Sequence, residues 1–135
     1  MVINLRSKRL SALFSEVWNN LPKKDRDSIS GRTLLIVDNP IFLSKNHGPL
    51  WGAVICVRFR KSIVILYLTP RKLNQQSESF VRYVIAHELA HVRKDHAEKL
   101  FSVTMNKTTE ARFEREANEQ ARRWGFPKRR PNSKP

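Results

Sequence analysis

Residues 80–92 read Phe80-Val81-Arg82-Tyr83-Val84-Ile85-Ala86-His87-Glu88-Leu89-Ala90-His91-Val92, an HExxH motif inside a mostly apolar run. Two residues four apart on an α-helix are separated by about 40° around the axis and about 6 Å along it. The rings of His87 and His91 therefore lean toward one point, and one Zn²⁺ at about 2.0–2.1 Å from each ring nitrogen fits between them. Glu88 projects beside this pair, where its carboxylate can take a proton from water. The motif predicts two zinc ligands and one catalytic base.

Two alternatives to a metal site need weighing. With four histidines in 135 residues, composition alone gives a chance HExxH a probability of about one per cent or less. The two histidines could also be structural, with hydrogen bonds satisfying their rings. A buried helix with two inward histidines and a glutamate needs a reason, because polar groups are costly to bury. We expect a metal to be that reason.

Length and cysteine content limit the organisation of the chain. A sequence of 135 residues predicts one domain, at residues 1–127, with no separate recognition domain. The only cysteine, Cys56, excludes an internal disulfide and favours a reducing, cytoplasmic compartment. The N-terminal residues lack a secretory apolar region, and the longest apolar stretch, residues 63–68, is too short to span a membrane. We therefore expect no membrane association.

The chain is strongly basic, with a net charge of +14. Such a charge favours encounter with a polyanion such as DNA, or with an acidic protein surface. A solvated basic surface without a partner explains the composition equally well. Basic residues recur along the whole sequence and gather near its end, at Arg122, Arg123, Lys128, Arg129 and Arg130.

Hydrophobic periodicity predicts a long helix at residues 3–21, ended by Pro22, and then a polar connection at residues 23–31. Runs of β-branched and aliphatic residues predict three strands, at residues 33–37, 53–59 and 63–68, with the last two forming a hairpin. Residues 41–52 between the first two strands are expected to form a loop.

Two further helices follow. Ser77 or Ser79 can cap the HExxH helix, and another helix begins near Thr108 or Thr109. An apolar stripe at Phe113, Ala117, Ala121 and Trp124 runs along this last helix, and Gly125 and Pro127 end it. Residues 128–135 form a basic tail without apolar residues, which predicts disorder.

A catalytic zinc site normally takes three protein ligands and leaves one position for water. The third ligand could come from His96, Glu110, Glu114 or Glu116. In a continuous helix His96 would lie about 140° around the axis from His91 and could not reach the same ion. Turning the chain back usually requires a glycine, and none occurs from Ala53 to Trp124. His96 is therefore expected to be exposed.

The sequence Glu114-Arg115-Glu116-Ala117-Asn118-Glu119-Gln120-Ala121 resembles the second motif of gluzincin metallopeptidases of the ImmA/IrrE type, in which ExxAN follows HExxH on the next helix. The resemblance implies that Glu114 is the third zinc ligand and that Asn118 steadies a ligand histidine. Glu114 flanks the apolar stripe, and Glu116 is expected farther toward solvent. Alternatively, Glu114 belongs to a charged helix face with its neighbours. A weaker similarity links the chain to zinc proteases of the SprT and YgjP groups.

The resemblance implies an α+β, zincin-like fold: an N-terminal helix, a small three-stranded sheet, the HExxH helix and a C-terminal ligand-bearing helix. It implies a zinc endopeptidase that acts on a protein substrate such as a DNA-associated transcriptional regulator. The strand at residues 63–68 would offer its edge to an extended peptide. His47 and Tyr83 are weak candidates for stabilising an oxyanion. The alternative is a non-enzymatic, basic nucleic-acid-binding module with a structural zinc site.

Overall fold

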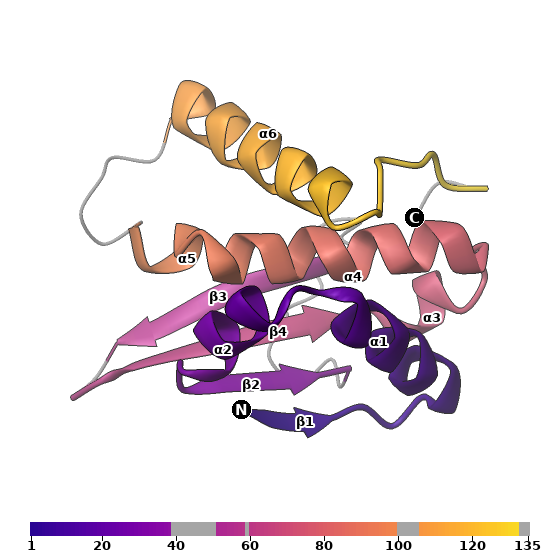
Figure 1. The fold of residues 1–135 in the computed structure, drawn as a ribbon, viewed down its shortest axis with the longest axis horizontal. Coiled ribbons are helices and arrows are strands. Elements are labelled where there is room, and N and C mark those ends of the chain that lie inside the picture. The colour runs from indigo at the N-terminus through magenta and orange to yellow at the C-terminus, as the bar shows by residue number, and fades with distance from the viewer. Residues whose placement is uncertain (39–50, 59, 100–105, 133–135) are drawn as a thin grey trace.

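A mixed four-stranded sheet forms one layer of the fold (Figure 1). The computed structural model describes residues 1–38, 51–58, 60–99 and 106–132. The strand order is β1-β2-β4-β3, and β1, β2 and β4 are parallel while β3 runs antiparallel to β4. Within the described part of the chain, β1 and β3 are therefore the outer strands of the sheet. The strands are β1 (Val2–Asn4), β2 (Leu34–Val37), β3 (Gly52–Arg58) and β4 (Ser62–Leu68).

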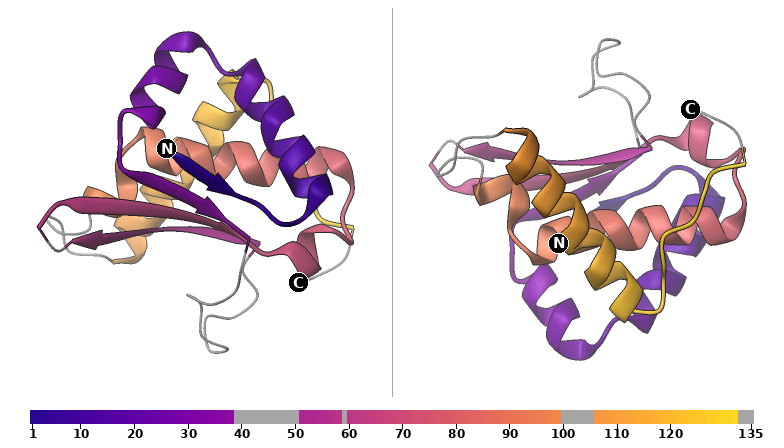
Figure 2. Two further views of the ribbon diagram at one scale, coloured as in Figure 1. Left: turned by 90° about the horizontal axis from the view of Figure 1, so that it is seen from below. Right: turned by 90° about the horizontal axis from the view of Figure 1, so that it is seen from above.

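Helices cover one face of this sheet. Figure 2 shows α1, α2 and α4 on the same side of the strands, and Figure 1 shows α4 between the sheet and α6. Because α4 has neighbours on both sides, most of its residues are buried. The helices are α1 (Lys8–Asn20), α2 (Lys23–Ser30), α3 (Pro70–Leu73), α4 (Glu78–Arg93), α5 (His96–Lys99) and α6 (Lys107–Arg123).

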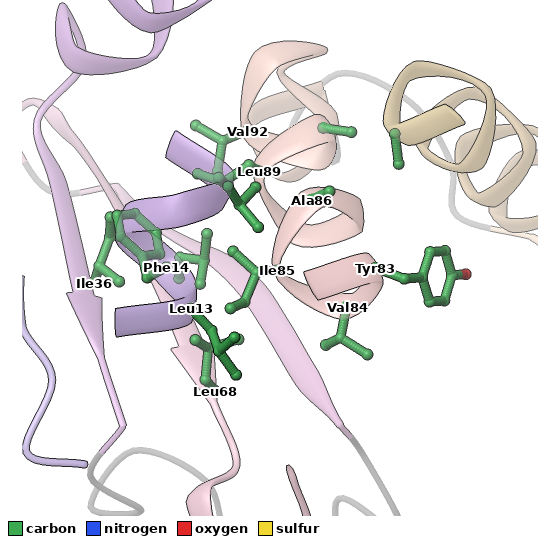
Figure 3. Close-up of a cluster of buried hydrophobic side chains, with 14 of the residues drawn as sticks. Leu13, Phe14, Ile36, Leu68, Tyr83, Val84, Ile85, Ala86, Leu89 and Val92 are labelled. Carbon is green, nitrogen blue, oxygen red and sulfur yellow. The ribbon is translucent and has the colours of Figure 1, made fainter. Parts of the chain in front are cut away.

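The main core lies between α1, α4 and the sheet (Figure 3). Leu13 and Phe14 of α1 meet Ile85 and Leu89 of α4, with Leu68 of β4 below them. Burying each such side chain contributes about 1.5–3 kcal/mol. This packing fixes the rotation of α4, so its opposite face, which includes Tyr83, turns toward α6.

Several predicted elements are confirmed. The strands at residues 34–37, 52–58 and 62–68 lie within two residues of their predicted ends, and the last two form the expected hairpin. Ser77 caps α4 by accepting a hydrogen bond from the Phe80 amide. In α6, the apolar stripe predicted from Phe113 to Trp124 is buried. The helix ends at Arg123, and Gly125, two residues later, has a φ of 97° that favours glycine.

The prediction for the N-terminal region was wrong in two respects. Residues 2–4 form a strand parallel to β2, so the sheet has four strands among the described residues rather than three. The first helix begins at Lys8 because the Asp38 carboxylate accepts hydrogen bonds from the amides of Arg6 and Ser7, at 2.9 and 2.8 Å. Ser7 then caps α1 through the amide of Leu10. A long-range partner thus interrupts a locally helical pattern.

Two further predictions were wrong. The expected polar connection at residues 23–31 contains α2, which buries Ile29 against the core. The strand at residues 62–68 is not an edge, because β2 and β3 flank it on both sides. Among the strands that the structure describes, the edge near the HExxH helix belongs to β3 instead.

The expected loop at residues 41–52 lies largely outside the described residues, and His47 lies wholly outside them. After α6 the described chain continues as coil to Asn132, whose amide donates a hydrogen bond to the Gln76 side chain at 2.6 Å. Among the described residues, no helix has the length and apolar character needed to cross a membrane.

Candidate active site

Three side chains from two packed helices converge at one point. His87 and His91 come from consecutive turns of α4, and Glu114 comes from α6. The two histidine Nε2 atoms are 3.1 Å apart, and each lies 3.0 Å from one oxygen of the Glu114 carboxylate. Among the described residues, this is the group whose donor atoms cluster closely enough to hold a metal ion.

The spacing of these donors fits a tetrahedral zinc ion. Zn²⁺ bonded to nitrogen and oxygen at about 2.0–2.1 Å places neighbouring donors about 3.3 Å apart. The separations of 3.0 to 3.1 Å are close to that value. Neutral imidazole and carboxylate are also the donor types that zinc accepts in hydrolases. The residues present therefore fit the metal that the motif predicts.

The electrostatics keep Glu114 ionised. Hydrogen bonds with His87 and His91 hold the pKa of this carboxyl far below its ordinary value, despite partial burial. Burial opposes protonation of His87, but the Glu114 hydrogen bond and the Glu88 charge raise the pKa of its ring overall. Glu114 is therefore in the deprotonated form that a metal ligand requires.

Asn118 holds the first histidine. Its Oδ1 lies 2.8 Å from His87 Nδ1 and 2.7 Å from the hydroxyl of Tyr83. An amide oxygen only accepts, so His87 donates a hydrogen bond from Nδ1 to Asn118, which leaves Nε2 as the ring atom that faces the donor cluster. Burial and the charges of Glu114 and Glu88 raise the pKa of Tyr83 to about 12, so its hydroxyl stays protonated and donates. Tyr83, a weak candidate for oxyanion stabilisation, contacts Asn118 here.

His96 lies elsewhere than expected. It was predicted to be exposed, but only 3% of it is accessible. The chain turns after α4 at Asp95, which adopts a φ of 57°. Aspartate tolerates this left-handed conformation better than most residues, so no glycine is needed. Arg32 holds the Asp95 carboxylate at 2.5 Å, and the turn brings His96 back beside His91, with the two Nδ1 atoms 2.8 Å apart.

The other candidate ligands do not join the cluster. Glu116 contacts His96 Nε2 at 3.0 Å. Its side chain is 40% exposed against 52% for Glu114, so the expected order of exposure was wrong. Glu114 lines an open cleft, whereas the Glu116 carboxylate contacts the edge of the buried His96 ring. Glu110 is one turn before Glu114 and lines the same cleft.

Glu88 is buried beside the cluster, with 7% of its surface exposed. Burial raises its pKa, and the Glu114 charge adds to this effect, while the neighbouring histidines oppose it. Gly52, the first residue of β3, lies directly against it. A Cβ atom at Gly52 would be 3.1 Å from Glu88 Cγ and 3.0 Å from the Tyr67 carbonyl oxygen. A side chain here would force Glu88 or the Tyr67 backbone to shift by a few tenths of an ångström, so glycine suits this close approach.

Two pockets meet at Glu88. The first has a volume of about 180 Å³ and extends past His91 toward His96 and Phe113. The second has a volume of about 350 Å³ and extends past His87 toward Trp51 and Tyr83. Both include Gly52, Glu88, Glu110 and Glu114. The donor cluster therefore lies between two open spaces along the first residues of β3.

The cluster is a two-histidine, one-glutamate group of metal-ligand type, and the family match places it in a peptidase-like protein. Residues 61–129, just over half of the chain, match the family described as the IrrE N-terminal-like domain of peptidase family M78. The chain belongs to this family, which confirms the resemblance to ImmA/IrrE proteins. No curated protein and no solved structure gave a significant match.

The matched region contains α4 and α6 but not β3. Sequence reasoning gave no role to Gly52, which precedes the matched residues, and placed His96 in solvent. A glycine at the start of a strand signals a close backbone approach. The signal for His96 was Asp95, a residue able to turn the chain.

Proposed function

We propose that the protein is a zinc-dependent endopeptidase with ligands His87, His91 and Glu114 and with Glu88 as general base. One observation carries the proposal: three metal-type donors lie within hydrogen-bond distance of one another, beside a buried glutamate, between two open pockets. Membership of a peptidase family supports the reaction class.

Bound zinc would act as a Lewis acid that polarises the scissile carbonyl and lowers the pKa of water. The Glu88 carboxylate would accept the proton of the attacking water and deliver it to the leaving amine. Its burial supports this role, because a raised pKa brings the carboxyl closer to the operating pH. Asn118 would keep the His87 lone pair directed at the ligand site.

The substrate would be an extended peptide paired with β3. Among the described strands this one lies at the edge of the sheet, and its first residues line the pocket that holds Glu88. Backbone groups on such an edge can add a peptide strand by β-augmentation. The two pockets on either side of Glu88 would receive side chains flanking the cleaved bond. Family membership and the charge of +14 favour a DNA-associated regulatory protein as the physiological substrate.

The alternative, a nucleic-acid-binding module with a structural zinc, is less well supported. Structural zinc sites have four protein ligands and are closed to solvent. Among the described residues the cluster offers three ligand residues, and Glu114 is half exposed in an open cleft.

The test is hydrolysis of a quenched fluorescent peptide library by the zinc-loaded protein, compared with Glu88→Gln. Glutamine has the same size but cannot accept the proton, so the variant should keep zinc and lose about 10²- to 10⁴-fold in rate. Glu98→Gln, whose carboxylate contacts Arg32 outside the pockets, is the matched control and should retain the wild-type rate. Wild-type activity in Glu88→Gln would exclude the mechanism.

A further inference from the structure

The second ligand histidine has its own chain of hydrogen bonds. His91 Nδ1 lies 2.8 Å from His96 Nδ1, and His96 Nε2 lies 3.0 Å from Glu116 Oε1. The His96 ring is buried and stacks on Phe113, with centroids 4.2 Å apart and planes 11° from parallel. These contacts fix the plane of the ring that faces His91.

The position of each proton in this chain follows from its terminal acceptor. An ionised carboxylate only accepts hydrogen bonds, so Glu116 requires the His96 proton on Nε2. His96 Nδ1 then carries a lone pair and accepts from His91 Nδ1–H. With its Nδ1 proton committed to His96, His91 can offer a bound metal the lone pair of Nε2, the atom that faces His87 Nε2 and Glu114.

We propose that His96 and Glu116 form a positioning relay that selects the metal-binding tautomer of His91 and fixes its ring. This inference rests on the proposed metal site. Ligand histidines usually donate their second nitrogen to a carboxylate or carbonyl, whereas here a second histidine stands between the ligand and the carboxylate. Asn118 accepts the Nδ1–H hydrogen bond of His87 directly, without an intervening histidine. Each ligand histidine therefore has an acceptor for its Nδ1 proton.

The turn at Asp95 makes the relay possible. Its positive φ starts α5 at once and returns His96 to the face of α4 that bears His91. Without this turn a helical continuation would place His96 about 140° away from His91. The left-handed conformation of Asp95 therefore places the His96 ring between His91 and Glu116.

Two substitutions at position 96 separate positioning from packing. His96→Phe keeps a flat ring against Phe113 but has no acceptor for His91 Nδ1–H. His96→Asn loses the stacking but places its Oδ1 near the original Nδ1 position. The zinc dissociation constant of the apo-protein, measured by competition with a chelating dye, is the readout. The relay predicts about 10- to 100-fold weaker binding for His96→Phe, with binding largely restored in His96→Asn.

Glu116→Gln should also weaken zinc binding, because a glutamine amide can hydrogen-bond either tautomer of His96. Glu119→Gln is the control on the same helix, since its carboxylate contacts only exposed arginines, and it should bind zinc as wild type does. Ring ¹⁵N NMR of the wild-type protein should show His96 protonated on Nε2.

The outcomes are distinct. If wild type binds zinc and His96→Phe binds it equally well, the relay is wrong while the metal site stands. Weak binding by His96→Asn beside normal binding by His96→Phe would assign His96 to packing and overturn the relay. If wild type binds no zinc, the proposed function fails and the relay fails with it.

Discussion

Replacing Asn118 should damage both the stability of the protein and its metal affinity. In Asn118→Leu the Nδ1–H of His87 and the hydroxyl of Tyr83 lose the oxygen they now share, at 2.8 and 2.7 Å. Each buried donor left without a partner costs about 1–3 kcal/mol. The two together should lower the free energy of unfolding of the zinc-free protein by about 2–5 kcal/mol. Urea unfolding monitored by circular dichroism measures this change.

The metal affinity should fall in parallel. A ligand histidine without its partner typically binds about 10- to 100-fold more weakly, and dye competition measures the zinc dissociation constant. Asn118→Asp is the matched variant, because a carboxylate still accepts both hydrogen bonds, and it should bind zinc nearly as tightly as wild type. Tyr83→Phe removes one donor only and should cost about 1 kcal/mol. Wild-type stability and zinc affinity in Asn118→Leu would refute the reasoning.

Three further predictions concern other parts of the chain. Gly52→Ala should keep zinc but lower peptide hydrolysis by about 10-fold, because the new Cβ requires β3 or Glu88 to shift by a few tenths of an ångström. Gly31→Ala is the control, because its Cβ would also be tight, 3.2 Å from a backbone oxygen, but far from the pockets. The folded Gly31→Ala protein should hydrolyse peptides at the wild-type rate. Equal rates in the two variants would contradict this role of Gly52. Asp25→Ala should lower stability by about 2–4 kcal/mol in thermal or urea unfolding, because Trp124 and Arg93 lose their acceptor at 3.0 and 2.8 Å. Burial opposes ionisation of Asp25, but these partners lower its pKa overall. The contribution of Asp25 to the free energy of unfolding should therefore be present above about pH 4 and be lost below it. If Asp25→Ala leaves the pH dependence of stability unchanged, this contribution is excluded. Duplex DNA binding should be independent of sequence and of zinc and should weaken steeply with salt, and neutralising Arg122, Arg123, Lys128, Arg129 and Arg130 together should flatten that dependence in a filter-binding assay. No DNA affinity at low salt would withdraw the nucleic-acid role.

The sequence predicts the parts of the fold that local patterns determine. The hairpin of β3 and β4 follows from two β-branched runs, and α4 follows from its apolar periodicity and Ser77. The four-residue spacing of His87 and His91 is enough to bring their rings together, because the geometry of an α-helix alone sets the distance between them.

Features that depend on distant partners were missed. β1 forms because β2 offers it an edge and because Asp38 binds the amides that precede α1. Strand order is likewise a property of the whole sheet, which is why β4 was mistaken for an edge. The position of His96 depends on one left-handed residue whose conformation Arg32 supports from another part of the chain. Helical periodicity contains no information about such a turn.

The zinc content of the purified protein tests the central claim most directly. Elemental analysis of protein prepared without chelators should give one zinc per chain for wild type. Glu114→Gln should lose most of this zinc, because it removes the carboxylate that meets both histidines, and Glu116→Gln should lose much less. Metal-free wild type, or equal zinc loss in the two variants, would contradict the site of His87, His91 and Glu114.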